Sequence, residues 1–332
     1  MSQPLVSINL VVWNREHEVR ACLEAVRQQT YPYCEVVIFD NHSTDSTKDI
    51  IKKEFPEYTL IENDKNEGGP EKGWNRCLPL THGAYFLGLC VDVVLDKTFV
   101  AEAVRAMETM PAVGALQAKI YQMTNERKTD IIDTTGFLIF RSRKIINRGH
   151  GEKDTGQFPE GEIFSYEGAA PFWRRKALEE SAVYGEVHDE DFVWYALDID
   201  LGWRMRLLGW KSYFLPSLIA YHDRQTTKRL SKSWWDFIRL RRTIPRRKRM
   251  LDWRNTRFTF LKNDFFISAL KDFPFFVGRE FCLFCYIIMF EPFLLQALPR
   301  MLFLLPRMLR KRRWVMQHAR VSRQEMEQWF QR

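Results

Sequence analysis

The sequence predicts an α/β fold in which a mixed, mainly parallel sheet is flanked by helices and followed by a basic, apolar helical region. Three observations support this. Apolar, β-branched runs alternate with segments of helical spacing in the N-terminal part. Polar residues follow several of these runs directly. Charge is uneven, because residues 1–223 contain 25 Lys/Arg against 34 Asp/Glu and residues 224–332 contain 25 against 8.

The N-terminal residues predict a strand, a helix, a second strand and a second helix, in that order. Residues 5–13 are rich in apolar and β-branched types, which is typical of a buried strand. Residues 18–29 place apolar side chains at helical spacing, and Tyr31-Pro32 ends this helix. Residues 35–39 form another apolar run, and a Ser or Thr after it can cap a helix through residues 50–51.

Two further apolar runs continue this alternation. Residues 59–62 and 84–91 predict a third and a fourth strand. Open α/β sheets bind ligands at the carboxyl ends of their strands. The turns after Val12, Phe39 and Val91 should therefore meet at one crevice.

The turn formed by residues 40–45 follows the second strand. Asp40 is suited to accept a hydrogen bond from a base or a ribose hydroxyl. Capping of the next helix would account equally well for Ser43 and Asp45. The residue types at this turn leave both interpretations open.

A glycine-rich segment, residues 66–75, leads into a predicted helix. Its glycines would let the backbone approach a ligand closely. Its spacing differs from that of the phosphate-binding Gly-x-x-x-x-Gly-Lys-[Ser/Thr] loop. By itself this segment is weak evidence for any function.

Two residues are candidate metal ligands. Asp92 follows the fourth strand with no basic neighbour in sequence, and oxygen ligands of this kind match Mg²⁺ or Mn²⁺ bound to a diphosphate. A simple turn aspartate is the structural alternative. His222 ends a predicted short strand, residues 216–222, where a lone histidine is either structural or a ligand.

Asp198 and Asp200 begin a segment with helical spacing. Two carboxylates two residues apart cannot share one helical face, so only one of them can point into the crevice. One of the two is therefore a candidate general base.

The cysteines and the N-terminus indicate a reducing compartment. The six cysteines show no disulfide framework. Cys282 and Cys285 form a Cys-x-x-Cys inside an apolar run, but no second pair or histidine accompanies them, which disfavours zinc or redox roles. Residues 1–10 lack the features of a secretory signal, so we expect the N-terminal domain in the cytosol.

Together these segments resemble family 2 of the inverting glycosyltransferases, most closely its rhamnosyltransferase-like branch. The similarity runs in order through residues 5–225, which is more specific than any single motif. It implies a catalytic domain with the GT-A fold of nucleotide-diphospho-sugar transferases over residues 1–225. Residues 226–332 are then expected to form a C-terminal helical, membrane-associated region.

The resemblance also implies a donor site for a nucleotide-diphosphate sugar. The family's first strand and turn match residues 11–15, its Asp-Asn-x-Ser-x-Asp turn matches residues 40–45, and its glycine loop matches residues 66–75. The donor-binding residues implied in this way are Val12, Trp13, Asn14, Asp40, Asn66, Gly69, Asn75 and Asp92.

Catalytic and metal-binding roles follow from the same resemblance. Residues 90–92 replace the family's Asn-Pro-Asp, and only the last aspartate, Asp92, is kept as a metal ligand. Asp198 takes the role of the base in the segment Glu-Asp-x-Asp-Leu-x-x-Arg, where Leu197 has replaced the glutamate. His222 lies where relatives place a histidine on the metal, which would be Mg²⁺ or Mn²⁺.

The implied acceptor side contains Trp173, within residues 167–175, and Asp200. Residues 130–136 and 148–157 look like the rhamnosyltransferase branch and favour a deoxysugar donor such as dTDP-rhamnose. The implied activity is inverting sugar transfer to a lipid-linked or polysaccharide acceptor in cell-envelope glycan synthesis.

A non-catalytic sugar-nucleotide sensor or membrane scaffold with the same fold is the alternative function. Binding alone would not need a base, so the joint presence of Asp92, Asp198 and His222 favours the enzyme.

The C-terminal region predicts peripheral contact with the cytoplasmic side of the cell membrane. Its apolar runs are interrupted by charges and prolines and fall short of the roughly 18 uncharged residues of a spanning helix. Helices lying in the interface, with Lys/Arg against anionic headgroups, fit better. Alternatively, residues 258–305 pack on the catalytic domain or across a homo-dimer. Nucleic acid is not expected as a partner, because no reader motif accompanies the charge.

Overall fold

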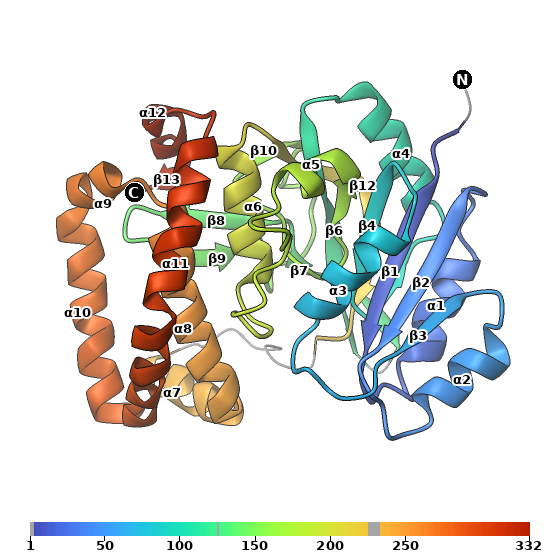
Figure 1. Ribbon diagram of the computed structural model, residues 1–332, viewed down its shortest axis with the longest axis horizontal. Helices are drawn as coiled ribbons and strands as arrows, with labels where there is room; N and C mark the ends of the chain where they lie inside the picture. Colours follow the sequence, from blue (N-terminus) through green and yellow to red (C-terminus); the bar gives the residue numbers. More distant parts are fainter. Residues whose placement is uncertain (1–2, 125, 225–232) are drawn as a thin grey trace.

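The computed structural model describes residues 3–124, 126–224 and 233–332. Figure 1 shows a twisted sheet with helices on both faces and a group of C-terminal helices packed beside it. This architecture confirms the predicted α/β class with a mixed sheet and a C-terminal helical region.

The elements follow the alternation that the sequence predicts in its N-terminal part. The strands are β1 (Val6–Val12), β2 (Cys34–Asp40), β3 (Thr59–Glu62), β4 (Tyr85–Leu89), β5 (Val93–Leu95), β6 (Val113–Thr124), β7 (Arg127–Thr134), β8 (Phe137–Phe140), β9 (Ile145–Asn147), β10 (Gly161–Ile163), β11 (Phe172–Arg174), β12 (Lys211–His222) and β13 (Phe330–Gln331). The helices are α1 (Val19–Arg27), α2 (Thr47–Glu54), α3 (Glu71–Cys77), α4 (Phe99–Thr109), α5 (Arg175–Glu180), α6 (Leu197–Leu207), α7 (Trp234–Thr243), α8 (Arg246–Asn263), α9 (Phe266–Lys271), α10 (Phe273–Phe290), α11 (Leu298–His318) and α12 (Arg323–Glu327), with short 3₁₀ turns η1 (Leu78–Leu80) and η2 (Pro292–Ala297).

Within the described residues, ten strands form one sheet in the order β10-β12-β6-β11-β4-β1-β2-β3, with β5 paired to β12 and β7 paired to β6. Strand β1 runs parallel to β2 and β4, and β3 continues this parallel group beyond β2. Strand β11 is antiparallel between β4 and β6. The parallel strands end at one edge, as Val12 opposite Asp40 shows, so the turns after them share that edge.

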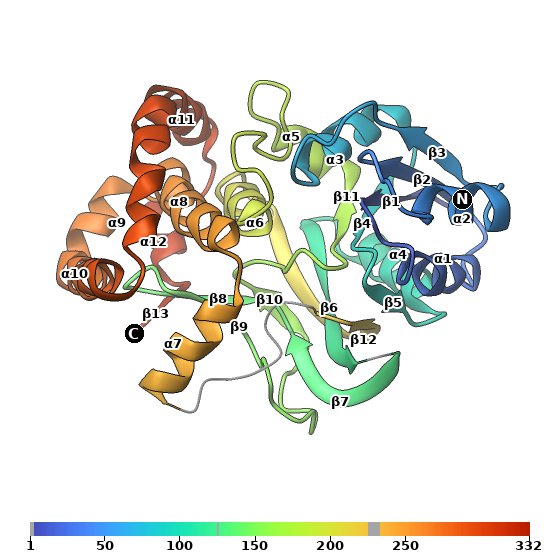
Figure 2. The same cartoon turned by 90° about the horizontal axis from the view of Figure 1, so that it is seen from below.

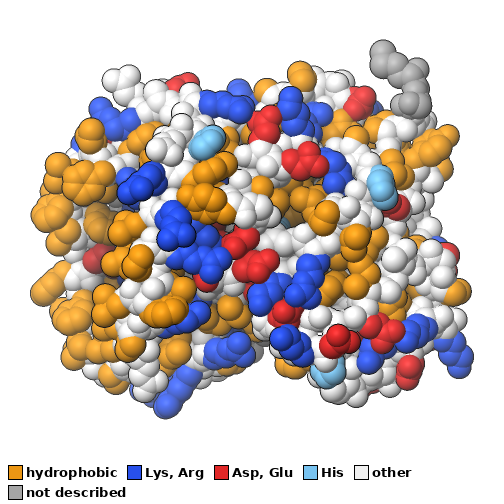
Figure 3. Space-filling view, in the orientation of Figure 1, with side chains coloured by type: hydrophobic (Ala, Val, Ile, Leu, Met, Phe, Trp, Pro, Cys, Tyr) orange, Lys and Arg blue, Asp and Glu red, His pale blue; other side chains and the backbone are white. Residues whose placement is uncertain are grey.

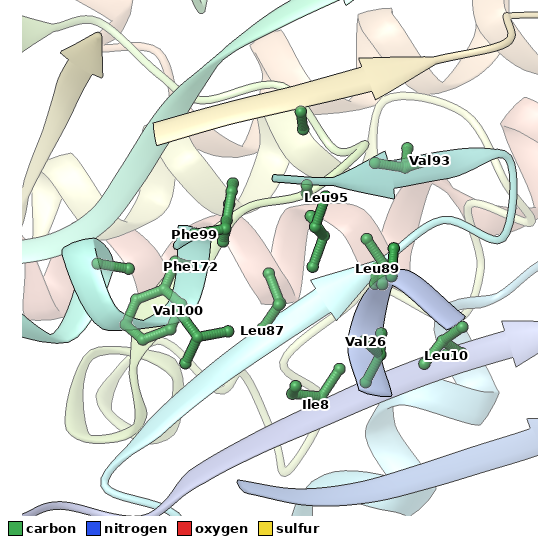
Figure 4. Close-up of a cluster of buried hydrophobic side chains, with 14 of the residues drawn as sticks. Ile8, Leu10, Val26, Leu87, Leu89, Val93, Leu95, Phe99, Val100 and Phe172 are labelled. Atoms are coloured by element: carbon green, nitrogen blue, oxygen red, sulfur yellow. The ribbon is translucent and has the colours of Figure 1, made fainter. Parts of the chain in front are cut away.

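Apolar side chains on the two faces of the sheet hold different helices. Figure 4 shows Ile8, Leu10 and Leu87 gathered with Val26 of α1 and Phe99 of α4. The β-branched and aliphatic residues of the parallel strands are buried because helices cover both faces. On the opposite face, helices α3, α5 and α6 cover the sheet.

The C-terminal helices α8 and α11 share a core with the N-terminal part of the chain. Phe258 of α8 and Met308 of α11 pack in one cluster with Leu197 of α6 and Trp74 of α3. The two regions lie side by side in both ribbon views (Figures 1 and 2). This packing agrees with the alternative in which part of residues 258–305 packs on the catalytic domain.

Helix α10 lies outside this shared core. Among the described residues it alone is long and apolar enough to cross a membrane by length and composition, with 18 residues, a mean hydropathy of 1.6 and 11% of the window buried. It contains Arg279 and Glu280, so the run is not free of charge, as the sequence indicates.

A buried charge cluster joins α8 and α11 to the segment that precedes α6. Lys262 is fully buried and pairs with Asp189 and, at 2.9 Å, with Asp200. Lys311 lies 2.7 Å from the other oxygen of Asp189. Removing one member of such a cluster leaves a buried charge without its full compensation, which destabilises strongly.

We therefore expect Lys262→Met to lower the free energy of unfolding by about 3 kcal/mol. The matched control is Lys271→Met, because Lys271 is exposed and its pair with Glu327 lies at the surface, where ion pairs contribute about 1 kcal/mol or less. Urea denaturation of both variants measures the difference. Equal stabilities would show that the C-terminal helices do not depend on the buried cluster.

Candidate active site

The turns after β1 and β2 are tied together by polar contacts. Asn14 has a left-handed backbone, with a φ of 51°, and its N–H donates to Ser43 Oγ at 2.9 Å. Its side-chain oxygen accepts from Thr44 N at 2.8 Å. Val12 is buried, whereas the neighbouring Trp13 is 49% exposed. The structure thus brings the predicted residues Val12, Trp13 and Asn14 to the edge where β2 ends.

Asp40 is fully buried at the carboxyl end of β2. One oxygen accepts from Ser43 N at 2.9 Å, whereas Oδ1 has no hydrogen-bond partner among the described residues. A buried acceptor without a donor is unfavourable, so this atom is suited to a donor group of a ligand. Asp45 instead bonds Thr47 at the start of α2, which agrees with the structural interpretation of that residue.

The glycine-rich segment contacts the chain that leads to α6. Asn75 donates to His188 O at 2.8 Å and accepts from His188 N at 2.9 Å. A Cβ at Gly69 would lie 2.5 Å from Trp194 N, so only glycine allows this approach. Asn66 accepts from Gly68 N at 2.8 Å within the loop. In this structure the side chains of Asn66 and Asn75 shape and anchor the loop, and Gly69 permits its contact.

Asp92 and His222 face each other across the ends of β4 and β12. His222 Nε2 lies 3.4 Å from Asp92 Oδ1, and His222 Nδ1 lies 3.0 Å from Asp133 Oδ2. Burial opposes protonation of His222, but the bonds to Asp133 and Asp92 outweigh it and raise the pKa of His222 to about 9. Burial also opposes ionisation of Asp92, yet the hydrogen bond from His222, its charge and Arg15 keep the pKa of Asp92 below its usual value.

Asp133 is fully buried and connects several cationic groups. Arg224 lies 3.0 Å from Asp133 Oδ2, and His150 lies 3.4 Å from the other oxygen. Burial would raise its pKa, but the bonds to His150 and His222 and the charge of Arg224 lower the pKa far below the ordinary value. Asp133 is therefore an anion that orients His222.

Asp198 lies in the first turn of α6, close to this group. Its carboxylate accepts from Gly168 N at 3.0 Å and from Ile199 N at 2.8 Å. Glu167, next to Gly168, bonds Arg224 at 2.6 Å. Burial and then the negative charge of Glu167 raise the pKa of Asp198 to about 7. A carboxyl group with this pKa is suited to exchange protons near neutral pH.

Trp173 and Asp200, predicted on the acceptor side, both lie inside the protein. Trp173 is 1% exposed and packs against Tyr166 and Phe86 in the core. Asp200 is also 1% exposed and is used by Arg204, Lys262 and Asn263. Their positions correct the expectation of direct acceptor contact, because both side chains are enclosed by other elements.

Among the described residues, no group of three or more His, Cys, Asp or Glu side chains is arranged to hold a metal ion alone. Asp92 and His222 nevertheless fit a shared cation, because their facing atoms lie close together and Asp133 holds the second nitrogen of His222. A bound cation would displace the proton that His222 Nε2 otherwise carries. Mg²⁺ commonly takes only one or two protein ligands and completes its shell with water and substrate phosphates.

Three site residues were not assigned from the sequence, namely Asp133, Glu167 and Arg224. Asp133 and Glu167 lie in segments singled out for other reasons, and Arg224 lies at the proposed domain boundary. Asp133 precedes His222 by 89 positions, so no local spacing could pair them. Only the fold brings these charges together.

We expect the carboxyl group of Asp198 to titrate near pH 7, and Glu167→Gln to lower its pKa by removing a like charge. The shift should be partial because burial is the larger cause. Carboxyl ¹³C NMR of aspartate-labelled protein measures the titration, and Asp198→Asn assigns the signal by its loss. A midpoint near 4 in the unsubstituted protein would contradict the described environment.

The chain matches one protein family over slightly more than half of its length. Residues 7–180 match the family model described as Glycosyl transferase family 2. A poly(ribitol-phosphate) beta-glucosyltransferase of Bacillus spizizenii is 34% identical over 87 residues, which cover 25% of this chain and 14% of that protein. The E. coli UDP-Glc:alpha-D-GlcNAc-diphosphoundecaprenol beta-1,3-glucosyltransferase WfaP is 30% identical over 105 residues, 32% of this chain and 42% of that protein. Both matches span less than half of the relative's own length.

Solved structures share the fold over more of the chain. S. aureus TarS 1-349 in complex with UDP-GlcNAc has a TM-score of 0.55 at 18% identity and covers 84% of this chain and 73% of that chain. The mannosyltransferase PcManGT from Pyrobaculum calidifontis, in complex with GDP-Man and Mn²⁺, has a TM-score of 0.50 at 17% identity, covering 91% and 74%. The likeness shows the GT-A fold. Because the family model covers more than half of the chain, this protein belongs to glycosyl transferase family 2.

Proposed function

We propose that this protein transfers a sugar from a nucleotide-diphosphate donor to an acceptor hydroxyl, with inversion at the anomeric carbon. One observation is the main support. Asp198 has a pKa near 7 and is linked through Glu167 and Arg224 to Asp133, which orients His222 beside Asp92. A candidate base and a candidate metal pair are thus held in one charged network.

Each side chain has a defined part in this proposal. Asp40 accepts a hydrogen bond from the nucleoside through its unpaired oxygen. Asp92 and His222 hold Mg²⁺ or Mn²⁺, which when bound neutralises the charge of the donor diphosphate. Asp198 removes the proton from the acceptor hydroxyl as that oxygen attacks the anomeric carbon. Inversion follows because the nucleotide leaves in a single displacement from the opposite face.

The donor sugar is proposed to be L-rhamnose from dTDP-rhamnose. This choice rests on residues 130–136 and 148–157, which resemble the rhamnosyltransferase branch. The relatives' names specify glucose, and the solved structures contain UDP-GlcNAc and GDP-Man. These donors therefore belong in the same test.

The acceptor is proposed to be lipid-linked or polymeric and part of cell-envelope glycan synthesis. The relatives' names specify poly(ribitol-phosphate) and GlcNAc-diphosphoundecaprenol, and both of these acceptors contain phosphate. The basic C-terminal region would attract an acceptor of that charge.

The first experiment combines a donor screen with two substitutions. With Mn²⁺, one of dTDP-rhamnose, UDP-glucose, UDP-GlcNAc and GDP-mannose should stabilise the protein thermally and be slowly hydrolysed. Asp92→Ala should abolish the stabilisation. Asp198→Asn should keep it but lower turnover by roughly a hundred to ten thousandfold, the usual contribution of a general base. Asp96→Asn is the matched control, because Asp96 bonds Thr98 at the start of α4.

The pH dependence adds a second criterion. Asp198 can accept a proton only when ionised, so turnover should rise about tenfold per pH unit below 7 and level off above it. Normal turnover of Asp198→Asn would refute its role as the base. Absence of binding with every donor would instead favour the sensor or scaffold function.

We further propose that helices α9, α10 and α11 contact the cytoplasmic face of the membrane. Phe266, Phe281 and Phe303 are 72%, 65% and 72% exposed. Figure 3 shows hydrophobic side chains along the left edge, over α9 and α10. Residues 224–332 also have an excess of 17 positive charges, 25 minus 8. Exposed aromatic residues together with basic residues suit an anionic lipid surface.

Phe281→Ser combined with Phe284→Ser should reduce binding to vesicles that contain anionic lipid by at least about tenfold, since burying each phenylalanine contributes roughly 1.5–3 kcal/mol. Co-sedimentation measures the bound fraction, and Tyr33→Ser, at an exposed aromatic residue outside these helices, is the control. If vesicles bind neither protein but the double variant breaks up a dimer in light scattering, this surface joins two copies instead.

A further inference from the structure

The residues just before the proposed base have an unusual backbone. Val193, Trp194 and Ala196 all lie in the left-handed region, with φ values of 48°, 85° and 62°. For a β-branched residue such as Val193 this conformation is disfavoured. Strained backbone of this kind persists only where surrounding contacts impose it, and it concentrates at functional sites.

Contacts from both halves of the molecule impose this conformation. Trp194 N donates to the buried Glu71 at 3.1 Å, and the adjacent Gly69 permits the close approach. From α8, Asn255 donates to Tyr195 O at 2.8 Å, and Arg254 donates to Phe192 O at 2.9 Å. The glycine-rich segment (residues 66–75, the donor loop) and helix α8 of the C-terminal region therefore hold residues 192–195 from two sides.

The result is an exposed aromatic platform close to the base. The Trp194 side chain is 49% exposed, although its backbone is fixed. It stacks on Tyr195, with ring centroids 5.2 Å apart and an angle of 22° between the planes. Asp198 follows four residues later, at the start of α6. A flat aromatic surface that costs little entropy to use suits the apolar face of a sugar ring.

Two cations, Arg247 and Lys248, lie beside this platform, and the carboxylate that acts on Lys248 is that of Asp252, one turn further along α8. Lys248 Nζ is 4.8 Å from the ring centre of Tyr195, and the first turn of α8, which contains Arg247 and Lys248, has no acidic residue. Burial and then the charge of Arg224 lower the pKa of Lys248 to about 8, which places Lys248 near the charged network of the site. Arg247 reaches the donor loop, 3.8 Å from a Cβ built on Gly68.

We propose that Trp194, Arg247 and Lys248 form the acceptor site, in which Trp194 stacks on the acceptor sugar and the two cations bind a phosphate attached to it. This inference rests on the proposed function and names the acceptor class, a sugar linked to phosphate. It also replaces the buried Trp173 and Asp200 as the acceptor side. The donor site of the proposed function contains other residues, Asp40 at the end of β2 and Asp92 after β4.

Binding of three synthetic probes to the full chain, preloaded with Mn²⁺ and whichever of dTDP, UDP and GDP it binds most tightly, tests this site. The probes are a short-chain alkyl GlcNAc-diphosphate, the alkyl GlcNAc without diphosphate, and the alkyl diphosphate without sugar. We expect Trp194→Ala to weaken the two sugar probes about tenfold and to leave the alkyl diphosphate unchanged. Arg247→Gln combined with Lys248→Gln should weaken both diphosphate probes at least tenfold and leave the uncharged sugar unchanged.

Tyr33→Ala and Lys271→Gln are the matched controls, because both side chains are exposed and lie outside the site. Failure of the unsubstituted protein to bind either diphosphate probe, or equal binding by all variants, would overturn the acceptor site. The affinities for dTDP, UDP and GDP, measured first, distinguish failure of the proposed function from failure of the acceptor site. If none of these nucleotides binds, the proposed function fails. If one of them binds to every variant and only the probes show no pattern, the acceptor assignment alone fails.

Discussion

The arrangement of the candidate active site depends on the buried carboxylate of Asp133. An anion in a protein interior is costly unless cations and donors surround it, and His222, Arg224 and His150 supply these contacts here. Asp133 thereby fixes the ring of His222 toward Asp92. Through Arg224 it also places Glu167 beside the backbone that binds Asp198. One buried charge thus determines how the candidate metal pair and the candidate base lie relative to each other.

The C-terminal region also helps to position the residues that lead to Asp198. Lys262 and Lys311 enter the protein from α8 and α11 and neutralise Asp189 and Asp200 on either side of the segment that leads into α6. Arg254 and Asn255 bind the carbonyl groups of that segment. The exposed apolar side chains of α9 and α10 are carried on this framework. If α9 and α10 contact a membrane, the membrane surface and the residues that lead to Asp198 are therefore held by the same helices, α8 and α11.

Gly69 allows the glycine-rich segment to pack closely against the residues that lead into α6. A side chain at position 69 would collide with the backbone of Trp194, so the donor loop can contact the residues before Asp198 only through a glycine. On the other side of this contact, Val193, Trp194 and Ala196 have the left-handed backbone conformation. The close approach explains why a segment expected to bind the donor has its side chains occupied with protein contacts.

Local residue patterns determined the fold class, the first four strands with their helices, and the edge at which Asp40 and Asp92 lie. These features depend on periodicity and on the rule that parallel strands end together, both of which are visible in a linear chain. The joining of His222 to Asp133, the burial of Trp173 and Asp200, and the exposure of Trp194 were decided only by the tertiary structure. Each of them depends on contacts between residues far apart in sequence, because burial and electrostatic pairing are set by which elements pack together and not by the type of any single residue.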